Sequence, residues 1–165
     1  MFLVKFLWLI SMVIYLAALL LTQLFMPLGV NIPLGNGFLS GLQMGQETYF
    51  WVGVVVILFI NGLLQMLGNL SLQLPTSLIP KGKYWMSEKH LCKQFKKNYK
   101  RWIKGLALVI NLFLSAFLVF IYELTDSDFE MDMTYWFVFF GVLGLSWIVF
   151  FFVWFNDTKG KLVKA

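Results

Sequence analysis

Apolar positions along the chain gather into four long runs, and the charged residues fall almost entirely between them. About 20 helical residues cross a hydrocarbon core of roughly 30 Å, and each run reaches this length. The pattern therefore predicts an all-α, four-helix transmembrane bundle in one membrane domain, residues 1–165, with spans at 2–26, 51–70, 105–124 and 134–155. The first run exceeds the roughly 7–15 apolar residues of a signal peptide, so we expect it to be retained. A cleaved signal followed by three spans is the alternative.

Basic residues are confined to the segments that a four-span topology places on one side of the membrane. They lie before the first span, between the second and third, and after the fourth: Lys5, the nine from Lys81 to Lys104, and Lys159, Lys161 and Lys164. Lysine and arginine accumulate in cytoplasmic loops, so both termini are predicted to be cytoplasmic. The opposite side carries the segment 27–46, which has no basic residue. Glycine and proline interrupt this segment, and we expect it to cover the outer ends of the helices.

The basic segment 87–104 has the pattern of an amphipathic helix before the third span. Its apolar face is formed by Leu91, Phe95, Tyr99 and Trp102. Ser87 is the predicted N-cap, and a turn at Gly105 is expected to lead into the span. The helix would lie at the cytoplasmic surface of the membrane, with its basic side chains toward anionic lipid headgroups: Lys93, Lys96, Lys97, Lys100, Arg101 and Lys104. We therefore expect lipid binding without a dedicated pocket, from a helix that serves as a positive-inside anchor; a partner-docking or lipid-sensing surface is the alternative.

Aromatic residues gather near the predicted ends of the spans. On the cytoplasmic side these are Tyr84, Trp85, Tyr99, Trp102 and Trp154. Tryptophan and tyrosine favour the membrane–water interface, where the ring is in lipid and its polar edge stays hydrated. Trp8 and Trp147 fall deeper in their spans, and we expect them to pack between helices.

Carboxamides recur every four residues at the end of the second span, at Asn61, Gln65, Asn69 and Gln73. This spacing places them on one helix face. Only the first two lie deep enough to need partners away from water. The third span runs in the opposite direction and carries Asn111 and Ser115. From the rise per residue, Gln65 is predicted to lie level with Asn111 and to form a hydrogen bond with it, and Asn61 to lie level with Ser115.

Ser11 and Ser146 fall near the depth of Ser115, so all four spans are expected to contribute to a polar layer near the membrane midplane. Two interpretations of this layer remain. Its groups form hydrogen bonds between helices, or they line a narrow path for an ion or small polar solute. No span carries an ionisable residue in its central part, which favours the first interpretation because ion pathways usually use such residues. A small channel or transporter is the alternative function.

Composition supports the membrane assignment and limits the chemistry. Hydrophobic residues make up 60% of the chain and charged residues 13%, against roughly 45–50% and 25% in soluble domains. The net charge of +5 arises from segments beside the spans, so no nucleic-acid partner is expected. Cys92 and His90 are the only residues of their kinds, so neither a dithiol redox pair nor a histidine-pair metal site is expected. We expect no enzyme activity and no cofactor. A lipid-modifying enzyme, with only Glu88 and His90 as candidates, is a third hypothesis.

The segment LPTSLIPKGKYW, residues 74–85, carries a pattern of three dipeptides: Leu74-Pro75, Ile79-Pro80 and Tyr84-Trp85. This pattern resembles a segment of uncharacterised bacterial four-helix membrane proteins that are distant relatives of the SdpI-like immunity and signalling family. The resemblance covers about a tenth of the chain together with the order of spans. It implies a multi-pass protein of the bacterial inner membrane with an accessory, immunity or signalling role and no assigned reaction. Apart from this resemblance, a membrane-protein partner or a homo-oligomer is a candidate interaction.

Overall fold

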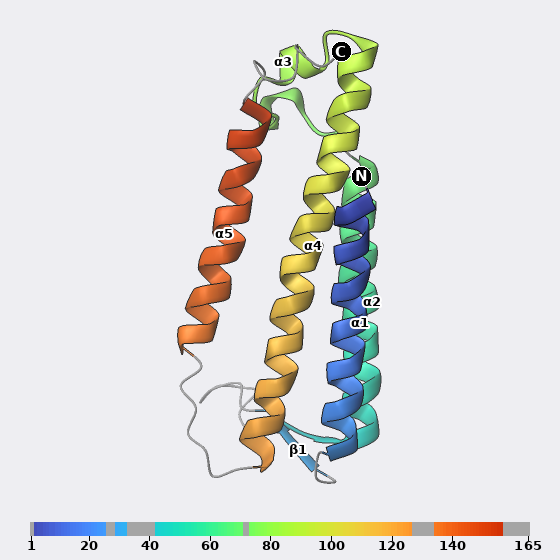
Figure 1. The fold of residues 1–165 in the computed structure, drawn as a ribbon, viewed down its shortest axis with the longest axis vertical. Helices are drawn as coiled ribbons and strands as arrows, with labels where there is room; N and C mark the ends of the chain where they lie inside the picture. Colours follow the sequence, from blue (N-terminus) through green and yellow to red (C-terminus); the bar gives the residue numbers. More distant parts are fainter. Residues whose placement is uncertain (1, 26–28, 33–41, 71–72, 127–133, 157–165) are drawn as a thin grey trace.

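The computed structural model describes residues 2–25, 29–32, 42–70, 73–126 and 134–156. Within these residues, four long helices follow one another: α1 (Phe2–Phe25), α2 (Gln46–Asn69), α4 (Lys89–Asp126) and α5 (Thr134–Asn156) (Figure 1). Each of the four is long and apolar enough to cross a membrane. The fold is therefore that of a multi-pass helical membrane protein, and the four predicted apolar helices are confirmed. Residues 26–28 and 157–165, which include the basic tail, lie outside the described residues.

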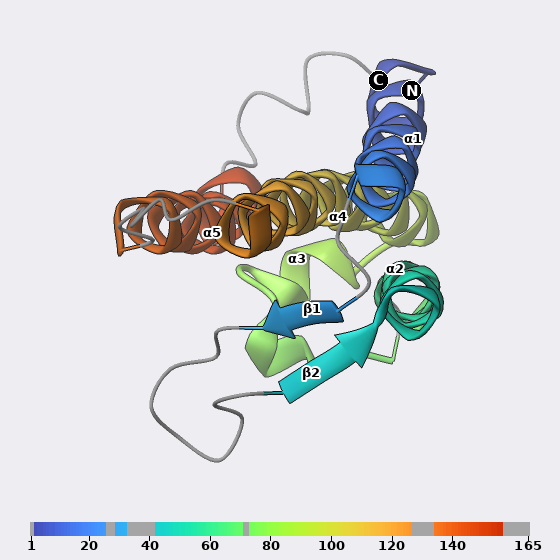
Figure 2. The same ribbon diagram turned by 90° about the horizontal axis from the view of Figure 1, so that it is seen from below.

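Helix α4 is the centre of the molecule, because it contacts α1, α2 and α5, whereas α5 approaches only α4 among the long helices (Figures 1 and 2). Helices α1 and α2 also pack against each other, and Leu19 lies so close to Gly53 that any Cβ there would clash. The arrangement is thus three packed helices with a fourth on one side. Apolar residues surround α5 on all faces, so its pattern did not indicate which face meets protein.

The helix predicted over 87–104 is not a separate element. Helix α4 begins at Lys89 and continues through Gly105 to Asp126, over 38 residues. The predicted turn at Gly105 is wrong. This glycine is a close-packing position, since a Cβ there would lie 2.1 Å from the Trp147 ring. At about 57 Å, the helix is much longer than the roughly 30 Å of a hydrocarbon core.

The segment 27–46, which is predicted to cover the outer ends of the helices, contains two short strands that the all-α prediction did not include. Strand β1 (Gly29–Ile32) pairs antiparallel with β2 (Leu42–Gly45), with Gly29 opposite Gly45 and Ile32 opposite Leu42. Strand β1 contacts α4 and α2, and the pair lies across one end of the helices (Figure 2). We call this the hairpin end. The residues between the strands, 33–41, lie outside the described part of the chain.

The opposite end, which we call the basic end, contains the start of α1, the end of α2, the start of α4 and the link from α2 to α4. This link holds a 3₁₀ turn, η2 (Thr76–Leu78), and a single helical turn, α3 (Gly82–Trp85). A Cβ at Gly82 would lie 2.1 Å from the Thr76 carbonyl oxygen, so the turn between them accepts only glycine without rearrangement. Ser87, the predicted N-cap of α4, instead donates its hydroxyl proton to the Tyr84 carbonyl oxygen at 2.8 Å.

Candidate functional site

A cluster of buried polar side chains joins α1, α2 and α4 near their middles. Asn61 Nδ2 donates to Asn111 Oδ1 at 2.9 Å, and Asn111 Nδ2 donates to Ser11 Oγ at 3.0 Å. Trp8 Nε1 donates to Asn61 Oδ1 at 2.8 Å, and the Ser11 hydroxyl donates to the Trp8 carbonyl oxygen at 2.7 Å. Asn61, Asn111 and Ser11 are almost completely buried. The four side chains, which we call the polar cluster, therefore form a closed set of hydrogen bonds between three helices.

The structure differs from the sequence prediction at three of the proposed layer residues. Asn111 pairs with Asn61 and not with Gln65, which is exposed one turn closer to the basic end. Ser115 is buried but donates to the Asn111 carbonyl oxygen of its own helix. Ser146 on α5 is exposed and takes no part.

The displacement of one helical turn has a physical cause. In the register that α2 and α4 adopt, Gly68 lies opposite Ile103, and Asn61, not Gln65, reaches Asn111. The prediction took Gly105 as the start of the third span. Because α4 is continuous there, the estimated depths were displaced.

Trp8 was expected only to pack between helices, and its part in the polar cluster was missed. Its indole N–H is a buried donor that needs an acceptor, and a buried asparagine on a neighbouring helix can supply one. A second buried hydrogen bond joins α1 to α2 nearer the hairpin end, where the Tyr15 hydroxyl donates to the Gly53 carbonyl oxygen at 3.0 Å. These side chains fix how α1 is rotated against α2.

The aromatic residues predicted for the cytoplasmic interface pack into a protein core at the basic end. Trp85, Phe95 and Phe155 are fully buried against one another, with ring centroids 5.2 to 6.0 Å apart. Trp85 Nε1 donates to the Phe155 carbonyl oxygen at 3.1 Å, which satisfies one of the free carbonyls at the end of α5. Trp85 belongs to the Tyr-Trp pair of the sequence segment described above. That segment therefore anchors the link between α2 and α4 to the end of α5.

The apolar face predicted for 87–104 contributes to this same core. Leu91, Phe95, Tyr99 and Trp102 are all buried. Trp102 and Trp147 each donate an indole N–H to the other's carbonyl oxygen, at 3.0 and 3.2 Å. The expected contact of this face with lipid is thus replaced by contact with α3 and α5, because α4 continues along its own axis and does not bend into the membrane plane.

Five basic side chains surround a cavity of about 290 Å³ at the basic end, between α1, α2 and α4. They are Lys5, Lys97, Lys100, Arg101 and Lys104, and Gln65 and Asn69 also line the cavity. Lys100 Nζ donates to Asn69 Oδ1 at 2.7 Å, and Lys104 Nζ lies 4.8 Å from the centre of the Trp8 ring. Of the six basic residues predicted to face lipid headgroups, Lys93 and Lys96 do not line this cavity. No carboxylate lies among its lining residues in the described part of the chain.

The Arg101 Nε atom is buried and has no hydrogen-bond partner among the described residues. Arginine guanidinium groups are planar donors that match oxyanions such as phosphate. A buried donor without an acceptor costs about 1–3 kcal/mol. The cavity therefore gathers concentrated positive charge, and one of the side chains that line it has a buried donor without an acceptor among the described residues.

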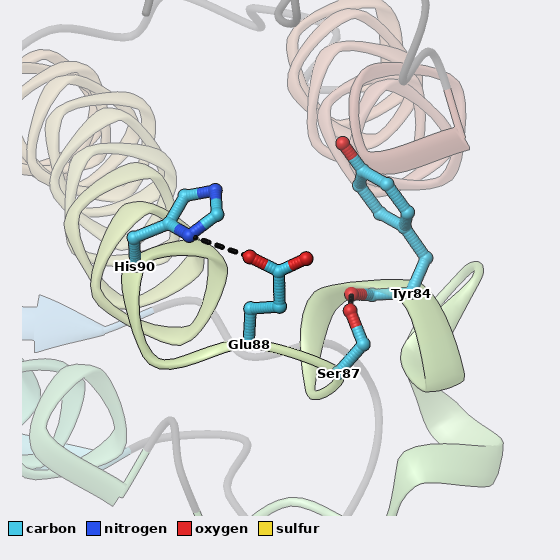
Figure 3. A network of polar contacts seen from close by, with 4 residues as sticks. All are labelled: Tyr84, Ser87, Glu88 and His90. Carbon is cyan, nitrogen blue, oxygen red and sulfur yellow. Dashed lines mark hydrogen bonds and ion pairs between the residues drawn. The ribbon is translucent and has the colours of Figure 1, made fainter.

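Glu88 and His90, the candidates for a lipid-modifying site, form an exposed pair at the start of α4. His90 Nδ1 lies 3.0 Å from Glu88 Oε2, and both side chains are 64% exposed (Figure 3). Ser87 points to the Tyr84 backbone and not to this pair. Among the residues that the structure describes, no group of three or more histidine, cysteine, aspartate or glutamate residues could hold a metal ion. Because the Glu88 and His90 side chains are both exposed, they do not lie in an enclosed site for a substrate.

Comparison of the chain with family models, with curated proteins and with solved structures gives no match. The resemblance to relatives of the SdpI-like family therefore stays a prediction from the LPTSLIPKGKYW segment. Functional inference depends on the polar cluster, the aromatic core and the basic cavity.

Proposed function

We propose that this protein is a non-enzymatic component of the bacterial inner membrane, acting through other membrane proteins in an accessory, immunity or signalling role. In this proposal α1, α2, α4 and α5 cross the bilayer and both termini lie in the cytoplasm. Lysine and arginine favour the cytoplasmic side. Lys5 lies at the start of the first predicted span and Lys104 precedes the third, and both line the same cavity, which supports placing these two basic groups on one side. The basic end is accordingly the cytoplasmic one, and the hairpin end faces outward.

The observation that carries the proposal is the closed hydrogen bonding of the polar cluster. A path for solutes requires polar groups that can exchange partners with the solute. Here the Asn61 and Asn111 amides bond to each other, to Trp8 and to Ser11. The cavity at the basic end is lined by Gln65 but by neither of these asparagines. The cluster is thus best explained as a device that holds three helices in one register.

Solute flux tests the proposal directly. Purified protein is reconstituted into liposomes, and the permeation of potassium ions, glycerol and urea is compared with that of protein-free liposomes. We expect equal rates for the wild-type protein and for Asn61→Leu. A faster flux through the wild-type protein that Asn61→Leu abolishes would establish the channel alternative and refute the proposal.

Partner capture tests the positive part of the proposal. Tagged protein is crosslinked in native membranes, purified, and the crosslinked species identified by mass spectrometry. We expect one membrane protein to be recovered in fixed stoichiometry. If an unrelated multi-pass protein that carries the same tag recovers an equal amount of this membrane protein, an accessory, immunity or signalling role would be contradicted.

A further inference from the structure

We infer that the basic cavity between α1, α2 and α4 is a specific binding site for the phosphate group of an anionic phospholipid. This goes beyond the proposed function and does not depend on it. The sequence alone predicts only a diffuse attraction of lysines to the membrane surface, with no dedicated pocket. The structure gathers basic side chains from two separate helices around one half-open cavity of about 290 Å³.

The chemistry of the cavity matches a phosphate oxyanion. Lys5 approaches from α1, and Lys97 and Arg101 from α4, so positive charge surrounds the space from more than one direction. The Arg101 side chain lines the cavity, and its planar guanidinium suits a phosphate oxyanion, while its Nε is buried and has no acceptor among the described residues. Gln65 and Asn69 add carboxamide groups that can donate to ester or glycerol oxygens. The exposed carboxamide of Gln65, which forms no bond to Asn111, would thus donate to the bound lipid.

The position of the cavity favours a lipid over a soluble phosphate. Lys5 lies in the first turns of α1 and Asn69 is the last residue of α2, so the cavity lies where both helices end. In a bilayer that is the headgroup level. The adjoining turns expose apolar side chains, including Leu7 on α1 and Met66 and Leu67 on α2. A ligand with a phosphate in the cavity would therefore have its acyl chains against apolar protein surface.

Two pairs of substitutions on α4 separate a site from diffuse attraction. Lys97→Gln with Arg101→Gln removes two positive charges from the cavity. Lys89→Gln with Lys93→Gln removes two charges from the same helix outside the cavity, at exposed positions. Binding of phosphatidylglycerol to each protein in zwitterionic micelles is measured by native mass spectrometry. We expect the cavity pair to raise the Kd about thirtyfold, which corresponds to about 2 kcal/mol at 25 °C, and the control pair to change it less than about threefold.

Binding of two other phosphate compounds identifies the source of the phosphate. Phosphatidylcholine and inorganic phosphate are each added in place of phosphatidylglycerol. We expect weaker binding of both, because the first is zwitterionic and the second has no acyl chains. Equal loss of phosphatidylglycerol binding in the two variant pairs would overturn the site, and binding of inorganic phosphate as tight as that of the lipid would overturn the lipid as its ligand. Lys5→Gln, which removes a cavity charge from α1, gives a second reading if the α4 pair does not fold.

Discussion

Replacing Asn61 with leucine tests whether the polar cluster holds the helices together. Leucine has a similar size but no polar atoms, so the substitution removes the bonds from Trp8 Nε1 and to Asn111 Oδ1. Hydrogen bonds between membrane helices contribute about 0.6 kcal/mol on average and up to about 1.7. The two bonds, with the partners left unsatisfied in a buried position, predict a loss of about 1–3 kcal/mol in unfolding free energy.

Gln65→Leu is the matched control, since it makes the same kind of change one turn away on the same helix. Gln65 is exposed, and its substitution should change the unfolding free energy by less than about 0.5 kcal/mol. Unfolding is followed by tryptophan fluorescence during titration with sodium dodecyl sulfate in mixed micelles. If Gln65→Leu destabilises the protein as much as Asn61→Leu does, the register derived for α2 and α4 is refuted.

The double variant sharpens this test. Once Asn61 is leucine, the Asn111 amide has lost its main partner, so replacing Asn111 as well removes a group that is already poorly satisfied. We therefore expect the two substitutions together to cost less than the sum of their single effects, with a coupling energy of about 0.5–2 kcal/mol. Additive effects would mean that the two amides do not interact.

Two further predictions concern topology and packing. Cys92 is the only cysteine, and a membrane-impermeant maleimide should label it only after cells are permeabilised. Thr48→Cys at the hairpin end, in a Cys92→Ala background, should be labelled in intact cells. The reverse pattern would refute the orientation. Gly105→Ala should displace Trp147 and lower the unfolding free energy by about 1–3 kcal/mol, whereas Gly141→Ala, whose Cβ would meet nothing within 4 Å, should be neutral or stabilising. A loss of stability in thermal unfolding that is equal for both would contradict the close packing at Gly105.

The apolar parts of the long helices could be predicted because hydrophobic length determines them, whereas α2 and α4 begin before the predicted spans, at Gln46 and Lys89. The start of α1 and the extent of α5 agree with the sequence prediction to within one residue. The arrangement around α5 could not be predicted, because phenylalanine and valine surround the helix and provide no amphipathic signal. Its contact with α4 depends on Gly105, Trp102 and Trp147 meeting in three dimensions.

The polar cluster was predictable in composition but not in register. Asn61 and Asn111 are identified by the cost of burying an amide among apolar residues, wherever the helices lie. Their pairing depends on how far α2 and α4 are displaced along each other, and the sequence prediction misplaced α4 by taking Gly105 as the start of the third span. The basic cavity could not be predicted at all. It requires Lys5 and Arg101, 96 positions apart, to be brought together by the packing of α1 against α4.

Helix α4 has no break between its lysine-rich half and the half that crosses the membrane. A continuous α-helix is a stiff rod, since every interior turn is held by its own hydrogen bonds. Pushing or rotating the lysine-rich portion therefore moves Asn111 with it and alters its fit to Asn61 and Ser11. Through this one element, a movement at the basic end is mechanically linked to the polar cluster between the three helices.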